Sequence, residues 1–323
     1  MKASELVIPL QQKMTSRSIK TFLSKYYIAI AFVIMIIAGS LLSPNFLSLT
    51  NFRNVSLQLS MAVIIAIGML FTVISGGIDL SVGSVVALGG CIAAGLTQEG
   101  MPPLLVLLVV TVLMAAAGSV SGLLVSKGRV APFIATLATM TIWRGAAYIY
   151  QVGQDRRIDG TQFVSLITGT VGPIPVPVLI MIAVALVAGF ILTKTSFGRS
   201  IYSVGGNREA ARLSGINIAL SLTMVYVISA VLSSLSGMIL TARLALGTAL
   251  VGQGYELDAI AAVVIGGASM NGGKGTVINT ILGAFIIGFL NNILNLMGVA
   301  AYPQMIIKGV IIVAAVIWKR SGR

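Results

Sequence analysis

Ten apolar segments follow one another along almost the whole chain, and they set the strongest limit on what it can fold into. They cover residues 27–43, 54–75, 80–97, 103–125, 130–151, 174–193, 219–242, 257–270, 276–297 and 302–318. An α-helix needs about 20 mostly apolar residues to cross the hydrocarbon core of a bilayer. Hydrophobic residues make up 57% of the chain and charged residues only 9%, against about 25% charged in soluble domains. These segments therefore predict an all-α polytopic membrane protein with about ten transmembrane helices.

The positions of Lys and Arg predict the orientation. Ten spans place both termini on the same side, and with that side inside, fifteen Lys and Arg residues lie inside and four lie outside. Positive charge is enriched on the cytoplasmic side of membrane proteins. We therefore expect a basic cytoplasmic tail over residues 1–26, one transmembrane domain over 27–318 that includes a cytoplasmic loop at 194–218, and a short cytoplasmic tail over 319–323. The first apolar run is longer than that of a signal peptide, which predicts a retained helix.

Several function classes are excluded by composition. The chain has no histidine and a single cysteine, Cys91, so the sequence predicts no metal site, no disulfide within the chain and no His-based catalysis. The net charge of +13 does not indicate nucleic-acid binding, because the basic residues stand at the ends of apolar segments. A phosphate-loop candidate at 268–276 has Ala268 in place of the first glycine and Gly275 where Ser or Thr must bind magnesium. We therefore expect no ATPase site in this chain.

The third and eighth apolar segments are short and interrupted by glycine. They read IDLSVGSVVALGG from Ile78 and LDAIAAVVIGG from Leu257, and each has an aspartate near its start. Their positions suggest an inverted repeat of helices 2–5 and 7–10, and paired interrupted segments of this kind often line a transport site. The alternative is that two glycine-rich membrane helices resemble each other by composition alone. Elsewhere, Gly118-x-x-x-Gly122 predicts close helix packing.

Ionisable and amide side chains within the apolar segments are candidates for a translocation pathway, a gate or an intramembrane network. The candidates are Asp79, Arg144, Glu256, Asp258, Asn291, Asn292 and Asn295, and Lys308 is a further ionisable residue within a span. Charged groups are costly inside a bilayer and usually face a partner or water. Arg144 lies deepest and needs an acidic or carbonyl partner, for which Glu256 or Asp258 is available. Asp79 alternatively caps the third helix, and the asparagines alternatively join helices to one another.

The stretch NREAARLSG, within the longest inside loop, predicts one short helix. Asn207 is a favourable N-cap, Glu209 falls in the first turn, and Gly215 suits the position after the C-cap. Helices below about 12–15 residues are marginal in water, so this one needs a surface to lie on. A small charged helix on the cytosolic side suggests a docking site for a soluble partner, and the alternative is an ordinary basic loop.

Four motifs in order make the chain resemble the ribose-type sugar permeases of ATP-binding-cassette (ABC) importers. These motifs are SGGIDLSVGSVVAL at 75–88, NREAARLSGIN at 207–217, GYELDAIAAVVIGGAS at 254–269 and GFLNNILNLMGV at 288–299. The resemblance implies a type II ABC importer fold, in which two copies of the chain form a channel in a bacterial inner membrane and interact with membrane lipid. It implies that a cytosolic ATPase, which carries ATP and magnesium, docks on a coupling helix. That helix comprises Gly206, Asn207, Arg208, Glu209, Ala210, Ala211, Arg212, Leu213 and Gly215.

The resemblance further implies that a periplasmic or lipid-anchored binding protein delivers a monosaccharide, and that this chain binds no cofactor of its own. A stand-alone secondary sugar transporter is the main alternative, since inverted repeats are common there too. A proton-coupled carrier usually needs buried acids or histidines, which are scarce in this sequence. Few intramembrane charges also fit a neutral cargo, and the sequence leaves open which sugar is carried.

Overall fold

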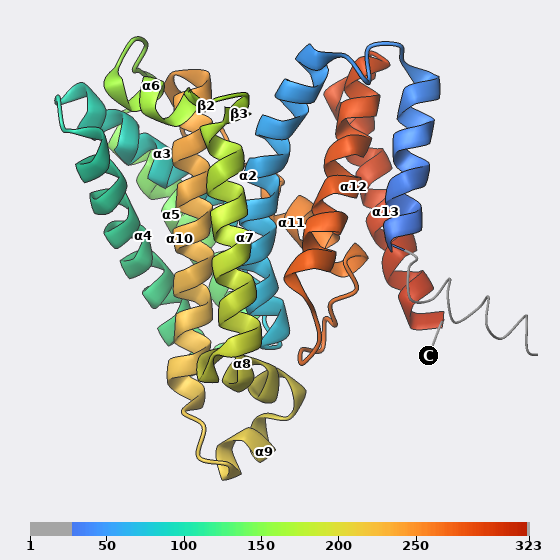
Figure 1. The fold of residues 1–323 in the computed structure, drawn as a ribbon. Coiled ribbons are helices and arrows are strands. Elements are labelled where there is room, and N and C mark those ends of the chain that lie inside the picture. Colours follow the sequence, from blue (N-terminus) through green and yellow to red (C-terminus); the bar gives the residue numbers. More distant parts are fainter. Residues whose placement is uncertain (1–27, 322–323) are drawn as a thin grey trace, which may run out of the picture.

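The computed structural model of the protein describes residues 28–321, and this part of the chain is almost entirely helical (Figure 1). The basic tail expected over 1–26 lies outside the described residues. A helix Ile28–Leu42 is followed by α2 (Leu49–Ile74), α3 (Val82–Gln98), α4 (Pro103–Ser126), α5 (Pro132–Gln151), α6 (Gln162–Thr168), α7 (Val176–Lys194), α8 (Ser196–Gly206), α9 (Arg208–Leu213), α10 (Ile218–Leu244), α11 (Tyr255–Ile265), α12 (Val277–Leu296) and α13 (Ala301–Ser321). Each of the ten predicted apolar segments coincides with a helix.

Two of these helices differ from the prediction by five residues at one end. The structure ends α11 at Ile265, five residues before the predicted end, because Gly266 caps it and Gly267 adopts a φ of +86°. A left-handed backbone of this kind stops a helix and suits glycine. At the other extreme, α2 begins five residues before the predicted start, since the Ser48 side chain accepts a hydrogen bond from the backbone N–H of Asn51. Capping groups, rather than hydropathy, set both boundaries.

Four very short strands and the helix α6 were not predicted. Strand β1 (Arg156–Arg157) pairs antiparallel with β4 (Leu246–Gly247), and β2 (Thr170–Val171) pairs with β3 (Ile174–Pro175). Figure 1 places β2, β3 and α6 at the end of the molecule opposite α9. The pairing of β1 with β4 places the segment after α5 and the segment after α10 at the same end of the molecule.

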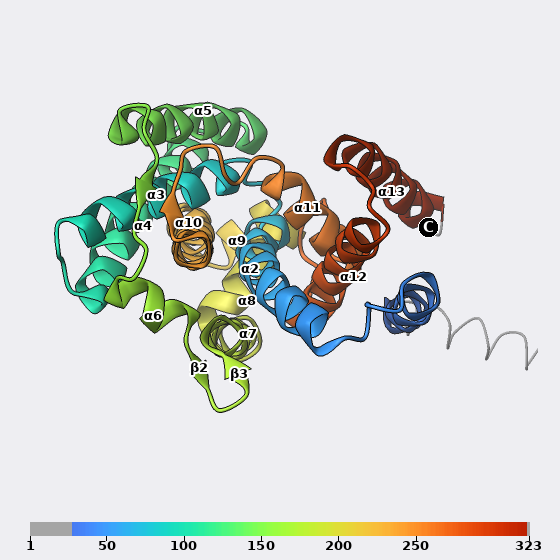
Figure 2. The same cartoon turned by 90° about the horizontal axis from the view of Figure 1, so that it is seen from above.

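Seen from above, α2 lies near the centre of the molecule, with α3, α4, α5 and α10 on one side and α12, α13 and Ile28–Leu42 on the other (Figure 2). Within the part of the chain that the structure describes, five helices are long and apolar enough to cross a membrane, namely α2, α4, α7, α10 and α12. Two shorter apolar helices, Ile28–Leu42 and α3, accompany them. Residues of α2 from Val63 to Ile74 are buried almost without exception, so α2 is a core helix rather than a lipid-facing one.

The predicted small-residue contact in α4 is present and lies against α10. A Cβ atom on Gly118 would stand 2.6 Å from the carbonyl oxygen of Tyr226, and one on Gly122 would stand 2.7 Å from the Cα of Thr223. Small residues let two helix backbones approach closely where lipid offers no hydrophobic driving force. The glycine pair therefore fixes the distance between α4 and α10.

Candidate functional site

The short helix expected at NREAARLSG is α9, and it projects from one end of the molecule (Figure 1). As predicted, the Asn207 side chain caps it by accepting a hydrogen bond from the backbone N–H of Ala210 at 3.0 Å, and Gly215 follows with a φ of +78°. Ala211 is buried against the molecule, whereas Leu213 is 76% exposed. The helix therefore presents an apolar side chain and several charges away from the body of the protein.

A surface ion pair within α9 orders its charged face. The Arg212 guanidinium donates to both carboxylate oxygens of Glu209, which stands three residues earlier. This contact lowers the pKa of the Glu209 carboxyl below its ordinary value. Both side chains are more than 60% exposed, so water and salt screen the pair and it adds little to the stability of the fold.

The preceding helix α8, which the sequence reading missed, holds α9 against the membrane-embedded helices. A Cβ atom on Gly205 would lie 1.8 Å from the carbonyl oxygen of Ile74, the last residue of α2. The backbone N–H of Gly273 donates to the same carbonyl at 2.8 Å. The Tyr202 hydroxyl donates to the carbonyl of Gly275 at 2.7 Å. The end of α8 thus contacts both α2 and the loop that joins α11 to α12.

A non-helical stretch between α10 and α11 runs alongside α3 into the molecule, and Arg144 holds it there. A Cβ atom on Gly83, near the start of α3, would lie 2.1 Å from the carbonyl oxygen of Gly252. The Arg144 guanidinium, on α5, donates to the carbonyls of Ala249, of Val251 at 2.6 Å and of Gly83 at 3.2 Å. Irregular backbone is tolerated at membrane depth only where its polar groups are satisfied inside the protein. Arg144 supplies hydrogen bonds to some of these polar groups.

The predicted pairing of Arg144 with an acidic residue, Glu256 or Asp258, is wrong. Arg144 and Glu256 line one cavity of about 400 Å³, but no ion pair joins them within the described residues. Asp258 instead accepts a hydrogen bond from the Lys308 ammonium, on α13, at 3.0 Å. Arg144 instead takes carbonyl partners, the alternative that the sequence also offered. The non-helical stretch between α10 and α11, called the descending stretch below, places several carbonyl acceptors within reach of one guanidinium.

Asp79 is buried in the turn between α2 and α3 and joins that turn to α10. One of its carboxylate oxygens accepts from the backbone N–H and the hydroxyl of Ser81, and the other accepts from the Ser229 hydroxyl at 2.7 Å. Ser81 is the N-cap residue of α3, and its side chain makes no capping bond. Asp79 therefore orders the turn before the helix instead of capping its first N–H groups. It lines neither of the two cavities.

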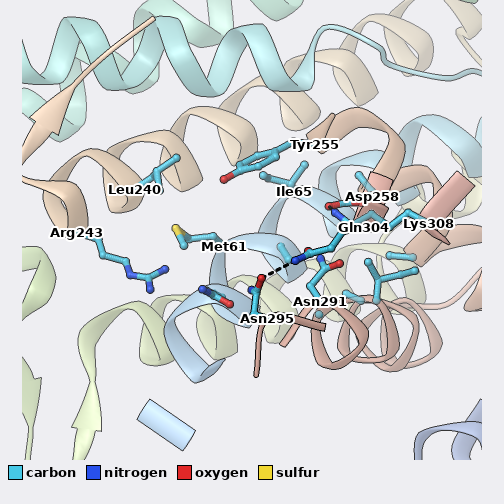
Figure 3. Close-up of a pocket in the computed structure, with 17 residues that line it drawn as sticks. Met61, Ile65, Leu240, Arg243, Tyr255, Asp258, Asn291, Asn295, Gln304 and Lys308 are labelled. Carbon is cyan, nitrogen blue, oxygen red and sulfur yellow. Dashed lines mark hydrogen bonds and ion pairs between the residues drawn. The ribbon is translucent and has the colours of Figure 1, made fainter. Parts of the chain in front are cut away.

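A second cavity, of about 300 Å³, gathers polar side chains from five helices (Figure 3). Its polar lining residues are Gln58 on α2, Arg243 on α10, Tyr255 and Asp258 on α11, Asn291 and Asn295 on α12, and Gln304 and Lys308 on α13. The Gln304 amide donates to Asn295 Oδ1 at 2.8 Å. The remaining lining residues are small or apolar, so polar groups face an apolar wall.

The structure thus divides the predicted pathway residues. Asp258, Asn291 and Asn295 share the cavity of Figure 3, whereas Arg144 and Glu256 share the other one. Asn292 lines neither and is buried, exchanging two amide hydrogen bonds with Asn51 of α2 at 2.8 and 3.1 Å.

Four polar residues of this cavity were not predicted as site residues: Gln58, Arg243, Tyr255 and Gln304. Tyr255 has Asp258 at i+3 and Gln304 has Lys308 at i+4, and both partners line the same cavity, so this spacing was a signal that could have found them. The pair Asn291 and Asn295, at i and i+4, gave a periodic signal of the same kind.

Comparisons with known proteins agree with this architecture. The family described as branched-chain amino acid transport system / permease component matches residues 51–316. The chain is 47% identical over 292 residues to the ribose import permease protein RbsC of Haemophilus influenzae, covering 89% of this chain and 90% of that protein. It is 44% identical to the protein of the same description from Escherichia coli, covering 92% and 94%, and 39% identical to the D-allose transport system permease protein AlsC of Escherichia coli, covering 88% and 87%. No solved structure matches the chain.

Proposed function

This chain belongs to the permease family that matches residues 51–316, and we propose that it conducts ribose or a closely related monosaccharide into a bacterial cell as the membrane subunit of an ABC importer. It is a permease component and not itself catalytic. The printed substrates of its relatives support a monosaccharide cargo. The observation that carries the proposal is α9, an exposed helix whose supporting contacts reach two membrane-embedded elements.

Helix α9 is the proposed docking site of the cytosolic ATPase. The exposed Leu213 and the charged face of Arg208, Glu209 and Arg212 give a partner both apolar and polar contacts. Because α8 contacts the end of α2 and the loop between α11 and α12, a displacement of α9 would reach helices on both sides of the molecule. ATP and magnesium belong to the partner in this scheme, and this chain needs no cofactor.

We propose that two copies of the chain face each other across the side of α5 that carries the cavity of Arg144 and Glu256. Gln253 is exposed on this side, and Thr141 is exposed on α5 beside Arg144. Polar groups at membrane depth are disfavoured against lipid tails and usually face protein or water. A water-filled path between two copies gives them that surrounding, and a periplasmic or lipid-anchored binding protein would release the sugar into it.

The proposed topology has ten membrane-crossing helices, of the type II ABC importer kind, with both termini and α9 cytoplasmic. The descending stretch before α11 and the turn before α3 are non-helical, and the helices α3 and α11 that follow them are both short. These paired interruptions support the proposed inverted repeat of the second to fifth and seventh to tenth predicted helices, because half-helices at corresponding positions are a mark of such repeats.

The experiment that tests the function compares sugar uptake in cells that carry the gene with uptake in a matched deletion strain. Radiolabelled D-ribose is the substrate, and unlabelled D-allose and L-arabinose serve as competitors. The proposal expects uptake that needs the chain, stops when ATP is depleted and survives a protonophore under conditions that maintain ATP. Uptake that stops with the protonophore at constant ATP would instead support a secondary transporter.

A further inference from the structure

The cavity of Figure 3 has the composition of a binding site for a small polyhydroxylated ligand. Amides and a phenol account for five of its eight polar lining residues, which are Gln58, Tyr255, Asn291, Asn295 and Gln304. Each amide offers both a donor and an acceptor, as each sugar hydroxyl does. A cavity of about 300 Å³ also lies at the lower end of the usual range for small-molecule sites, which suits a ligand of monosaccharide size.

The charges of the lining favour a neutral ligand. Asp258 and Lys308 form an ion pair with side chains that are 26% and 23% exposed, so each largely compensates the other. Arg243 is the remaining charge, and Figure 3 shows it across the cavity from that pair. Arg243 has no ion-pair partner within the described residues and can donate to sugar hydroxyls or to an anion, so the binding test includes phosphate as an anionic competitor.

One acceptor in the cavity has no partner within the described residues. Asn291 Oδ1 is buried and accepts no hydrogen bond, although the neighbouring Asn295 Oδ1 accepts one from Gln304. Leaving a buried acceptor unpaired is unfavourable, so a donor that enters the cavity gains the hydrogen bond. Across from this amide side, Met61, Ile65 and Leu240 offer apolar surface for the C–H groups of a sugar ring.

The cavity lies in the half of the molecule farther from α9. Arg243 stands in the last turn of α10, Asn295 in the last turn of α12 and Gln304 in the first turn of α13, at helix ends remote from α8 and α9. Asn295 is exposed there, so this end of the cavity is reached from that side. The deep end is formed by the first turns of α11, at Asp258 and Ala262.

We propose that each protomer binds one monosaccharide in this cavity, separately from the path between two copies. The inference rests on the proposed function, because it takes the cargo to be a sugar and the side remote from α9 to be the outer side. The site is weak, on the order of 1 mM, since a site in a transporter must also let its ligand leave. Its effect is to hold sugar that the binding protein has released and so to favour inward movement over escape.

The test measures equilibrium binding of radiolabelled D-ribose to the purified permease in lipid nanodiscs, without ATPase or binding protein. We expect saturable binding that Asn291→Ala weakens about fivefold to tenfold, the loss expected for one or two hydrogen bonds to a neutral ligand. Gln58→Ala, on a different helix, should act in the same direction. Asn279→Ala is the matched control, because it makes the same change on α12 at the end remote from the cavity, where its side chain makes no hydrogen bond in the described structure.

Thermal unfolding of each variant separates loss of binding from loss of folding. Equal affinity in wild type, Asn291→Ala and Gln58→Ala would overturn the inference, and so would the absence of saturable binding. Competition by inorganic phosphate would overturn it too, because the cavity would then be an anion or lipid-headgroup site. Uptake of D-ribose in cells is measured in parallel. Normal uptake together with no binding would defeat this inference alone, whereas absent uptake would defeat the proposed function.

Discussion

Arg144 shows how one residue makes an irregular segment tolerable at membrane depth. Its guanidinium donates to carbonyls on two different elements, the descending stretch and the start of α3. The sequence predicted that this arginine needs a partner, because a charge within an apolar helix is costly. Which partner it takes was not predictable. The carbonyls of Ala249 and Val251 become available only through a backbone path that no hydropathy pattern describes.

Replacing Arg144 by methionine should destabilise the protein. The change removes three hydrogen bonds from a charged donor, each worth about 1.5–3 kcal/mol, and leaves carbonyls unpaired. We expect a loss of about 3 kcal/mol or more, seen as a clearly lower melting temperature in detergent. Arg199→Met is the control, since its only described side-chain bond goes to the exposed Ser196. A melting temperature for Arg144→Met equal to that of the control would contradict this account of the descending stretch.

Asp79 and Ser229 should be energetically coupled. The aspartate accepts a hydrogen bond from the Ser229 hydroxyl at 2.7 Å while both side chains are buried, so each single substitution leaves the other group with a lost bond. A double-mutant cycle with Asp79→Asn and Ser229→Ala should give a coupling energy of about 1 kcal/mol or more, within the usual range for contacting residues. Chemical unfolding of the four proteins measures it. Strictly additive losses would mean that the contact contributes nothing.

At the scale of elements, the ten apolar segments were all predictable and the connections between them were not. Hydropathy over about 20 residues is a strong signal, and each predicted segment coincides with a helix. Helix α8 was not predicted because its eleven residues include three glycines and only a few apolar side chains, although the Thr195 side chain caps its first turn. The early end of α11 was not predicted because it depends on the backbone of Gly266 and Gly267 and on the close approach of α12 to Gly266. A Cβ on Gly266 would lie 2.6 Å from the Asn279 carbonyl oxygen.

Adjacent glycines at the end of α8 provide a sharp test of the contact with α2. Gly205→Ala would place a methyl group 1.8 Å from the Ile74 carbonyl oxygen, whereas Gly206→Ala meets nothing within 4 Å. We expect Gly205→Ala to push α8 away from α2 and to reduce ATP-driven sugar uptake at least about tenfold, the effect of about 1.4 kcal/mol on a coupled step. Gly206→Ala lacks this clash and should lower uptake clearly less than Gly205→Ala does. Equal uptake in the two variants would show that the close approach of α8 to α2 plays no part in coupling.

At the scale of the whole molecule, the two ends carry different chemistry. One end holds α8, α9 and the loop of Gly273 and Gly275 in a continuous set of contacts, and the other holds the short strands and the helix ends around the polar cavity. The sequence predicted which loops lie on which side, because basic residues mark the inside loops. It did not predict that the polar side chains separate into two cavities. That division depends on helix rotations that only packing determines.

The central claim is that residues 206–215 are where an ATPase acts on this permease, and a single-cysteine crosslink tests it most directly. Cys91 is fully buried and is replaced by serine, so that a cysteine introduced at the exposed Glu209 is the one thiol in the chain. Crosslinking in native membranes, with and without ATP, then reports what contacts α9. The account predicts a crosslink to an ATP-hydrolysing subunit whose yield changes with ATP. A thiol that reacts freely with a water-soluble reagent, and crosslinks to no protein in either condition, would contradict it.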